Sequence, residues 1–311
     1  MAQEGVTFGY VIQTVPRGFP DEVMADPSEA TRALVAATER AIQVLRGHFD
    51  TIWVEDHFQW GGDRPVLEAM STLCYLAARH EDMRFGTIVL GQSYRNPALL
   101  AKMGATLQAL TSGNFILGIG AGWKEDEYRA YGYPYPSDGV RIEQLEEAVQ
   151  VIRAMWSNSP ASFEGKHYRI ENAECQPLPN PPIPLLIGGG GEKKTLRVAA
   201  KYADWWTAPV QSLDQYAHKQ QVLAEHCQAI GRNPTEITHT FCARVSIVEN
   251  AADVYKGPGR YIVGGTPDAV THELEQLKAW GVKHFQLSFL GFPHTDDIEL
   301  FNSKVLPRLK G

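Results

Sequence analysis

Hydrophobic residues along this chain follow two patterns, short apolar runs and longer stretches in which apolar residues recur every three or four positions. The short runs are rich in β-branched and aromatic residues, which predicts buried strands. The longer stretches predict amphipathic helices that pack through one face. Eight runs predict strands: Val6–Ile12, Thr51–Val54, Arg84–Leu90, Phe115–Ile119, Ile183–Ile187, Asp204–Ala208, His239–Val248 and Lys283–Phe289. The stretches that predict helices are Ala30–Leu45, Val66–Ala78, Pro97–Leu110, Val140–Trp156, Lys193–Ala200, Leu213–Ile230, Pro267–Trp280 and Asp296–Arg308.

The regular alternation of strand and helix decides the expected fold. Eight such units in one chain predict a parallel sheet that closes into a (β/α)8 TIM barrel, an α/β fold. A chain of 311 residues can form such a barrel as one domain. No change in composition marks a boundary, so we expect a single domain over residues 1–311. An insertion is expected at about 158–182, with a hairpin around Phe163–Ile170.

Two glycine-rich segments suggest an alternative fold, the doubly wound sheet. The segment GIGAGW follows an expected strand, but Trp123 stands where a dinucleotide-binding fingerprint requires glycine or alanine. The segment GGGGEKKT ends in the Lys-Thr of a phosphate-binding loop, but Lys193 stands where a glycine must precede the lysine. Neither nucleotide motif is complete, so the barrel remains the expected fold.

Both glycine-rich segments still have a predicted role in ligand binding. Gly188, Gly189, Gly190 and Gly191 lie between a strand and a helix, where backbone N–H groups can approach an anion and the helix N-terminus adds positive charge. An anion or phosphate site is therefore predicted there, with a structural tight turn as the alternative.

The turn Gly120, Ala121 and Gly122 carries no bulky side chain. A flat ring can therefore lie against its backbone. The alternative is that these glycines permit close helix packing.

An ionisable cluster follows the apolar run Thr51–Val54, because Glu55, Asp56 and His57 come directly after it. Active sites of parallel α/β proteins lie at the carboxyl ends of the strands. Histidine changes charge near neutral pH and can move a proton, and a neighbouring aspartate can orient it. The alternative is a structural histidine at a strand end. No third ligand is spaced to join Asp56 and His57, so we expect no metal.

Composition narrows the possible partners and the compartment. The net charge is −7, which gives no electrostatic reason to expect nucleic acid or an anionic membrane as a partner. No secretory signal opens the sequence and no apolar run reaches the length of a membrane span, so we expect a cytoplasmic protein. Four cysteines, without zinc-site spacing, are expected to be buried small apolar residues. Three histidines are expected on helix or loop surfaces: His80, His167 and His226.

Four motifs, in this order, resemble the bacterial luciferase-like monooxygenase superfamily, and within it the group that uses the deazaflavin coenzyme F420. They are EDHFQW (55–60), RNPALLAK (95–102), LGIGAGWKEDEYRAYG (117–132) and LLIGGGGEKKTLRVAAKYAD (185–204). The resemblance covers approximately 6–208 and, more loosely, the rest of the chain. It implies a (β/α)8 barrel with insertions, coenzyme F420 as the cofactor, a small-molecule substrate and a homodimer.

The resemblance also implies roles for individual residues. Asp56 and His57 match an Asp-His pair beside the deazaflavin ring in the glucose-6-phosphate dehydrogenases of this family, where the histidine is a candidate proton acceptor. Trp60 resembles a tryptophan of that motif, which implies a catalytic and a substrate-binding position. Ile88 and Val89 match a cis non-proline peptide against the back of the ring. The other implied cofactor contacts are Gly120, Ala121 and Gly122 along the ring edge, and Ile187, Gly188, Gly189, Gly190 and Gly191 around the cofactor's chain and phosphate.

One departure from the family bears on the substrate. Trp123 stands where the sugar-phosphate dehydrogenases carry a glutamate acid, so this chain has an apolar wall in place of a proton donor. A flat or apolar substrate is therefore expected, with Arg95, Trp123 and Tyr128 as contacts. The alternatives are a monooxygenase of the same superfamily that uses reduced FMN, and a non-catalytic flavin- or deazaflavin-binding protein.

Overall fold

The computed structural model describes residues 5–62, 64–255, 257 and 260–310. The chain divides into two compact units. Unit 1 comprises Met1–Glu68, Thr207–His218 and Thr238–Gly311, and unit 2 comprises Ala69–Trp206 and Lys219–Ile237. The single domain over 1–311 stays a prediction.

Within its described residues, unit 1 contains five parallel strands in the order β11-β10-β12-β1-β2. They are β1 (Thr7–Val11), β2 (Thr51–Val54), β10 (Thr238–Ile247), β11 (Ile262–Gly265) and β12 (Val282–Phe289). Four of them lie where apolar runs predict strands. β11 is an additional strand that pairs with β10, and the prediction missed it because IVGG is short and half glycine.

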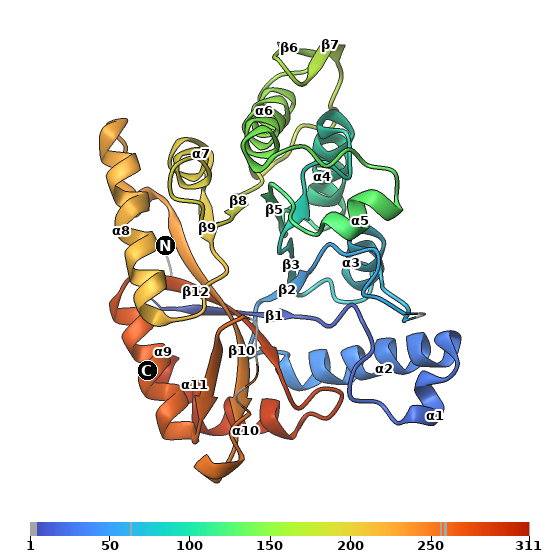
Figure 1. Ribbon diagram of the computed structural model, residues 1–311, viewed down its shortest axis with the longest axis vertical. Helices are drawn as coiled ribbons and strands as arrows, with labels where there is room; N and C mark the ends of the chain where they lie inside the picture. The colour runs from blue at the N-terminus through green and yellow to red at the C-terminus, as the bar shows by residue number, and fades with distance from the viewer. Residues whose placement is uncertain (1–4, 63, 256, 258–259, 311) are drawn as a thin grey trace. The chain divides into compact units, whose positions relative to one another are not determined.

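The helices of unit 1 cover these strands. They are α1 (Asp21–Met24), α2 (Pro27–Leu45), α9 (Pro267–Ala279), α10 (Asp296–Lys304), α11 (Leu306–Lys310), the first residues of α8 (Leu213–Ala229) and a 3-10 turn, η2 (Ala251–Asp253). The side chain of Asp26 caps α2 by accepting from the backbone N of Ser28 at 2.8 Å, and Pro27 occupies the first turn. α9 packs on β10, β11 and β12, while α10 packs on β10 and α2 (Figure 1).

Aromatic side chains fill the core of unit 1. Phe8 stacks on Phe285 with ring centroids 5.4 Å apart, and Phe289 meets Phe301 edge to face at 5.4 Å. Phe49 lies 5.6 Å from Phe8 and joins the two pairs. Burial of each such ring contributes about 2–3 kcal/mol, so these rings anchor the helices to the strands.

Unit 2 contains the strands β3 (Arg84–Thr87), β5 (Phe115–Gly120), β8 (Leu185–Gly188) and β9 (Trp205–Thr207), in that order, with β4 (Leu90–Gly91) also paired to β5. β5 pairs in parallel with both β3 and β8. The run 84–90 was predicted as one strand, but it is interrupted by a cis peptide bond between Ile88 and Val89. That cis peptide confirms the expectation from the family resemblance.

The helices of unit 2 are α3 (Ala69–Ala77), α4 (Pro97–Leu110), α5 (Glu125–Ala130), α6 (Asp138–Ser157), α7 (Thr195–Tyr202), the rest of α8 and a 3-10 turn, η1 (Pro234–Glu236). α4 packs beside α6 and on β5 (Figure 1). The side chain of Asn96 caps α4 by accepting from the backbone N of Ala98 at 2.9 Å.

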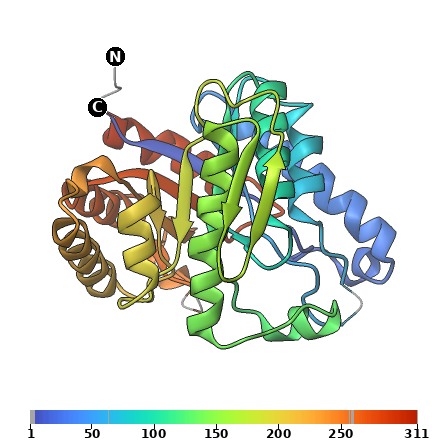
Figure 2. The ribbon, with the colours of Figure 1, turned by 90° about the horizontal axis from the view of Figure 1, so that it is seen from above.

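The insertion forms an antiparallel hairpin, which confirms that part of the prediction. Its strands are β6 (Ala161–Glu164) and β7 (Arg169–Ala173), and Phe163 pairs with Ile170. The hairpin lies along α6 (Figure 2). It therefore adds a layer outside the α6 helix.

The burial of the cysteines agrees only in part with the prediction. Cys175, Cys227 and Cys242 are buried as predicted, but Cys74 is exposed on α3, so that part of the prediction is wrong. Among the residues that the structure describes, no helix is both long and apolar enough to cross a membrane.

Candidate functional site

The carboxyl end of β2 in unit 1 brings three predicted site residues together. Asp56 is buried, whereas His57 and Trp60 are half-buried. The rings of His57 and Trp60 meet edge to face, with centroids 4.7 Å apart and an interplanar angle of 77°. The guanidinium of Arg17 lies 5.1 Å from the centre of the Trp60 indole, a cation–π arrangement. The side chains of Trp60 and His57 therefore form one aromatic group at the end of this strand.

Two arginines that the sequence did not single out, Arg17 and Arg260, lie near Trp60 or Glu55. Arg260 pairs with Glu55 at 2.8 Å and donates to the sulfur of Cys242 at 3.3 Å. Cys242 and Glu55 together hold the pKa of Arg260 above its ordinary value. Burial lowers the pKa of Arg17, and the nearby Glu55 partly offsets that effect. No local sequence motif identifies these arginines. Arg17 follows β1 and Arg260 precedes β11, and both come near Glu55 only in the folded unit.

In unit 2, Val89 explains why two predicted cofactor contacts are glycines. A Cβ on Gly188 would lie 2.7 Å from Cγ2 of Val89, and one on Gly120 would lie 2.8 Å from the same atom. Real side chains do not tolerate such distances. The residue that follows the cis peptide thus occupies the space beside both strand ends, which accounts for glycine at these two positions. Their contact with a cofactor stays a prediction.

The turn after β5 is supported by a buried tyrosine. Gly122 has φ +77°, and a Cβ there would lie 1.9 Å from the hydroxyl oxygen of Tyr128. Tyr128 is fully buried, with its ring centre 4.8 Å from that of Tyr94 and 5.0 Å from that of Tyr135. Its side chain therefore supports the turn from inside unit 2, and its role as a substrate contact remains untested.

The other two predicted substrate contacts of unit 2 are accessible to solvent. Trp123 is 66% exposed, and its carbonyl oxygen accepts from the hydroxyl of Tyr135 at 3.0 Å. Arg95 is half-buried directly before α4. The indole of Trp123 is thus presented outward directly after the glycine turn.

The glycine run before α7 is built around Thr195. A Cβ on Gly189, which has φ +140°, would lie 2.7 Å from Cγ2 of Thr195, and one on Gly191 would lie 2.8 Å from its hydroxyl oxygen. The backbone N of Leu196 donates to the carbonyl of Gly191 at 3.0 Å. Ile187 is buried in β8, one position before the run. Gly188 ends β8, and Gly189–Gly191 lead into the turn at 192–194 that precedes α7, so the anion site there stays a prediction.

His80, one of the histidines outside the β2 motif, differs from expectation. His80 is only 4% exposed, so the prediction that it lies on the surface is wrong, whereas His167 is half-buried. His226 is half-buried, and its Nε2 lies 2.7 Å from the carbonyl oxygen of Glu192. Within the described residues, no group of three or more His, Cys, Asp or Glu side chains is arranged to hold a metal ion.

Comparison with solved structures defines the fold of this protein. The structure superposes on an F420-dependent secondary alcohol dehydrogenase in complex with an F420-acetone adduct, with a TM-score of 0.81 and 20% identity over 99% of this chain and 100% of that chain. It also superposes on the oxygenating constituent of 3,6-diketocamphane monooxygenase from Pseudomonas putida in complex with FMN, with a TM-score of 0.74 and 15% identity over 98% and 99% of the two chains. The protein therefore has the predicted (β/α)8 barrel fold.

The family follows from the sequence. A family model described as luciferase-like monooxygenase matches residues 7–282, and the chain belongs to this family. One relative is the F420-dependent glucose-6-phosphate dehydrogenase of Kineococcus radiotolerans, 33% identical over 217 residues. That match covers 68% of this chain and 64% of the relative, so the chain spans less than two-thirds of that protein's length.

Proposed function

We propose that this protein is an oxidoreductase that binds the deazaflavin coenzyme F420 and transfers a hydride between it and a small organic substrate. The observation that carries the proposal is the Asp56-His57 pair at the carboxyl end of β2, on the fold of this family. The similarity to F420-dependent enzymes in both sequence and fold supports it.

The residues of unit 2 are compatible with a flat cofactor. The turn Gly120–Gly122 presents backbone and one methyl group, and Val89 fills the space beside it with apolar carbons. Further along the chain, Gly188–Gly191 offers backbone N–H groups ahead of α7, which begins at Thr195, for an anionic group of the cofactor. We propose these segments as the residues that hold F420, together with Ile88 and Ile187.

When bound, F420 supplies a ring that accepts or donates a hydride. The chain's own task is then to hold a substrate carbon against that ring and to move the accompanying proton. We assign the proton to the imidazole of His57, which is half-buried and packs against Trp60. Asp56, its buried neighbour, orients the ring, while Trp60 excludes water beside it.

The proposed substrate is flat or apolar. Trp123 follows the glycine turn as a 66% exposed indole, which suits contact with an apolar surface and offers no proton. Arg95, half-buried before α4, is the proposed polar contact. A sugar phosphate oxidised with the help of a glutamate at the position of Trp123 is not compatible with this chain.

A second candidate is a monooxygenase that uses reduced FMN, and the fold shared with the FMN-bound Pseudomonas putida enzyme favours it. In that case His57 is a neighbour of the ring and not the proton acceptor. A third candidate is a protein that binds F420 without turnover. It predicts the same tight binding of F420 but no catalysis.

The deciding experiment is a titration of the apo-protein with F420 and, separately, with FMN, followed by tryptophan fluorescence. We expect micromolar or tighter binding of F420 and much weaker binding of FMN. Preference for FMN contradicts the proposal and favours the monooxygenase. Tight F420 binding without turnover in a screen of alcohols, ketones and unsaturated apolar compounds favours the non-catalytic protein.

We also propose a cytoplasmic location and a homodimer. The family resemblance supports these two proposals, and two-fold dimers are the commonest oligomers of soluble proteins. Light scattering coupled to size exclusion tests the dimer, because a single species of 34.5 kDa would contradict it.

A further inference from the structure

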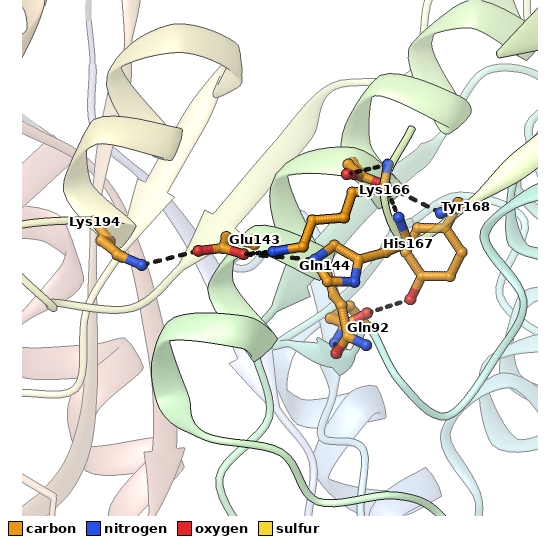
Figure 3. Close-up of polar contacts among 8 residues, drawn as sticks. Gln92, Glu143, Gln144, Lys166, His167, Tyr168 and Lys194 are labelled. Carbon is orange, nitrogen blue, oxygen red and sulfur yellow. Dashed lines mark hydrogen bonds and ion pairs between the residues drawn. The ribbon is translucent and has the colours of Figure 1, made fainter. Parts of the chain in front are cut away.

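The turn of the inserted hairpin is fixed to α6 by two glutamates that lie one helical turn apart. The carboxylate of Glu147 accepts from the backbone N atoms of Lys166, His167 and Tyr168, at 2.9, 2.7 and 3.0 Å. Glu143 pairs with the ammonium of Lys166 at 3.0 Å (Figure 3). The hairpin turn is thereby held at a defined position along the helix.

Two further features show that this attachment is specific. Burial opposes the charge of Glu147, yet the three backbone hydrogen bonds outweigh burial and lower its pKa. Gly165 opens the turn, and a Cβ there would lie 2.4 Å from Oε2 of Glu147. The turn sequence therefore leaves room for the carboxylate that binds it.

From this turn, Tyr168 reaches a different part of unit 2. Its hydroxyl donates to Oε1 of Gln92 at 2.8 Å, and Figure 3 shows the phenol directed at that amide. Gln92 is only 1% exposed, and its Nε2 donates to Ser93 at 2.6 Å and to Gln144 at 3.3 Å. Both ends of the amide have partners, so its orientation is fixed.

Gln92 in turn holds the glycine turn that follows β5. Its backbone N donates to the carbonyl of Gly120 at 3.0 Å, and the preceding Gly91 pairs with Gly120 in the sheet. A continuous set of hydrogen bonds thus runs from the hairpin, through Tyr168 and Gln92, to the first residue of the segment Gly120–Gly122.

We propose that Tyr168 and Gln92 are positioning residues, through which the inserted hairpin holds the segment Gly120–Gly122 in the conformation that receives the cofactor ring. This inference rests on the proposed function for the identity of the ring. The insertion then contributes to cofactor binding without touching the cofactor. A hairpin that only covers α6 would not need a half-buried tyrosine whose hydroxyl is bonded to a residue 76 positions away.

The variant that tests the proposal is Tyr168→Phe, which keeps the ring and removes the hydroxyl. We expect amide hydrogen exchange of Gln92 and of Gly120–Gly122 to accelerate at least about threefold in the apo-protein, because one hydrogen bond of the set is lost. The affinity for F420 should fall about fivefold, the effect of one hydrogen bond. The melting temperature should stay within about 2 °C of the unmodified protein.

The matched control is Tyr75→Phe, which removes a tyrosine hydroxyl from α3 in the same unit, where Tyr75 is 45% exposed. It should change neither exchange at Gly120–Gly122 nor affinity. If Tyr168→Phe fails to fold, Glu147→Gln tests the same attachment at its other end and should accelerate the same amides.

The outcomes separate this inference from the proposed function. Unchanged exchange at Gln92 and Gly120–Gly122 in both variants overturns the positioning role, whatever the cofactor. Faster exchange with weaker F420 binding supports it. If the unmodified protein does not bind F420, the proposed function fails, and the exchange data alone decide whether the hairpin holds the turn.

Discussion

The indole nitrogen of Trp53 donates a hydrogen bond to Nε2 of His284, with 2.9 Å between the nitrogens, and both side chains are fully buried in unit 1. An indole N–H is only a donor, so Nε2 of His284 is the acceptor and the imidazole carries its proton on Nδ1. That atom lies 2.7 Å from the hydroxyl oxygen of Thr7. The strand that carries Asp56 and His57 is therefore anchored to β12 inside the unit.

Gly9 makes this hydrogen bond possible, which gives the first prediction. A Cβ on Gly9 would lie 2.1 Å from the indole nitrogen and 2.7 Å from Nε2 of His284. Gly9→Ala should lower the free energy of unfolding by about 2–4 kcal/mol, because it combines overpacking with a broken buried hydrogen bond. Urea denaturation measures the change. Gly5→Ala is the control, since a Cβ there meets no atom within 4 Å, and a similar loss in both variants would contradict the prediction.

The second prediction concerns Val89 and Gly188. Gly188→Ala should destabilise the protein by about 1–3 kcal/mol, because its Cβ would lie 2.7 Å from Val89. The same substitution should cost much less in a Val89→Ala background, where that space is free. A double-mutant cycle by chemical denaturation measures this coupling. Additive effects would show that the clash does not decide the identity of residue 188.

Replacement of His57 separates proton transfer from binding. His57→Ala should lower kcat about 10²- to 10⁴-fold, the usual effect of losing a general acid or base. The Kd for F420 should change no more than about threefold, because the residues proposed to hold the cofactor lie in the two glycine-rich segments. Steady-state kinetics and fluorescence titration give the two values. Collapsed binding with retained turnover would refute the assigned role.

Trp123 tests the expected substrate class. Trp123→Ala should raise KM for apolar substrates about tenfold, since it removes an aromatic wall. It should change stability by less than about 0.5 kcal/mol, because the side chain is 66% exposed. Leu110→Ala, at a 77% exposed apolar residue of α4, is the control for exposure alone. Equal kinetics in both variants would remove Trp123 from the substrate site.

Glu273 gives the stability a pH dependence. Burial raises the pKa of this carboxyl from 4.5 to about 7, and a hydrogen bond with Tyr261 opposes the shift. Between these values the unfolded chain has lost the proton that the folded protein retains, so stability falls as pH rises from about 4.5 to about 7. Because Glu273 is partly exposed, the effect should be on the order of 1 kcal/mol.

Glu273→Gln should remove this part of the pH dependence and leave the protein more stable than the unmodified form at pH 8. Urea denaturation at pH 5 and at pH 8 measures the difference. A variant with the same pH slope as the unmodified protein would show that another group titrates in this range.

The sequence by itself determined most of the elements and predicts where the chemistry lies. Most apolar runs, such as Thr51–Val54, locate a strand within one or two residues, because the residue types record locally which side chains are buried. The exceptions are the run 84–90, which a cis peptide bond interrupts, and β11, which was missed. The alternation of strand and helix gave the barrel. The position of Asp56 and His57 at a strand end is equally local, and so is the glycine turn before Trp123.

Only the tertiary structure decided which distant residues meet. The pairing of Arg260 with Glu55 and the hydrogen bond from Tyr168 to Gln92 join residues far apart in the chain. The close approach of Val89 to Gly188 is another contact of this kind. A side chain's type reports whether it prefers to be buried, but its partner is chosen by the path of the backbone, and no local pattern encodes that path.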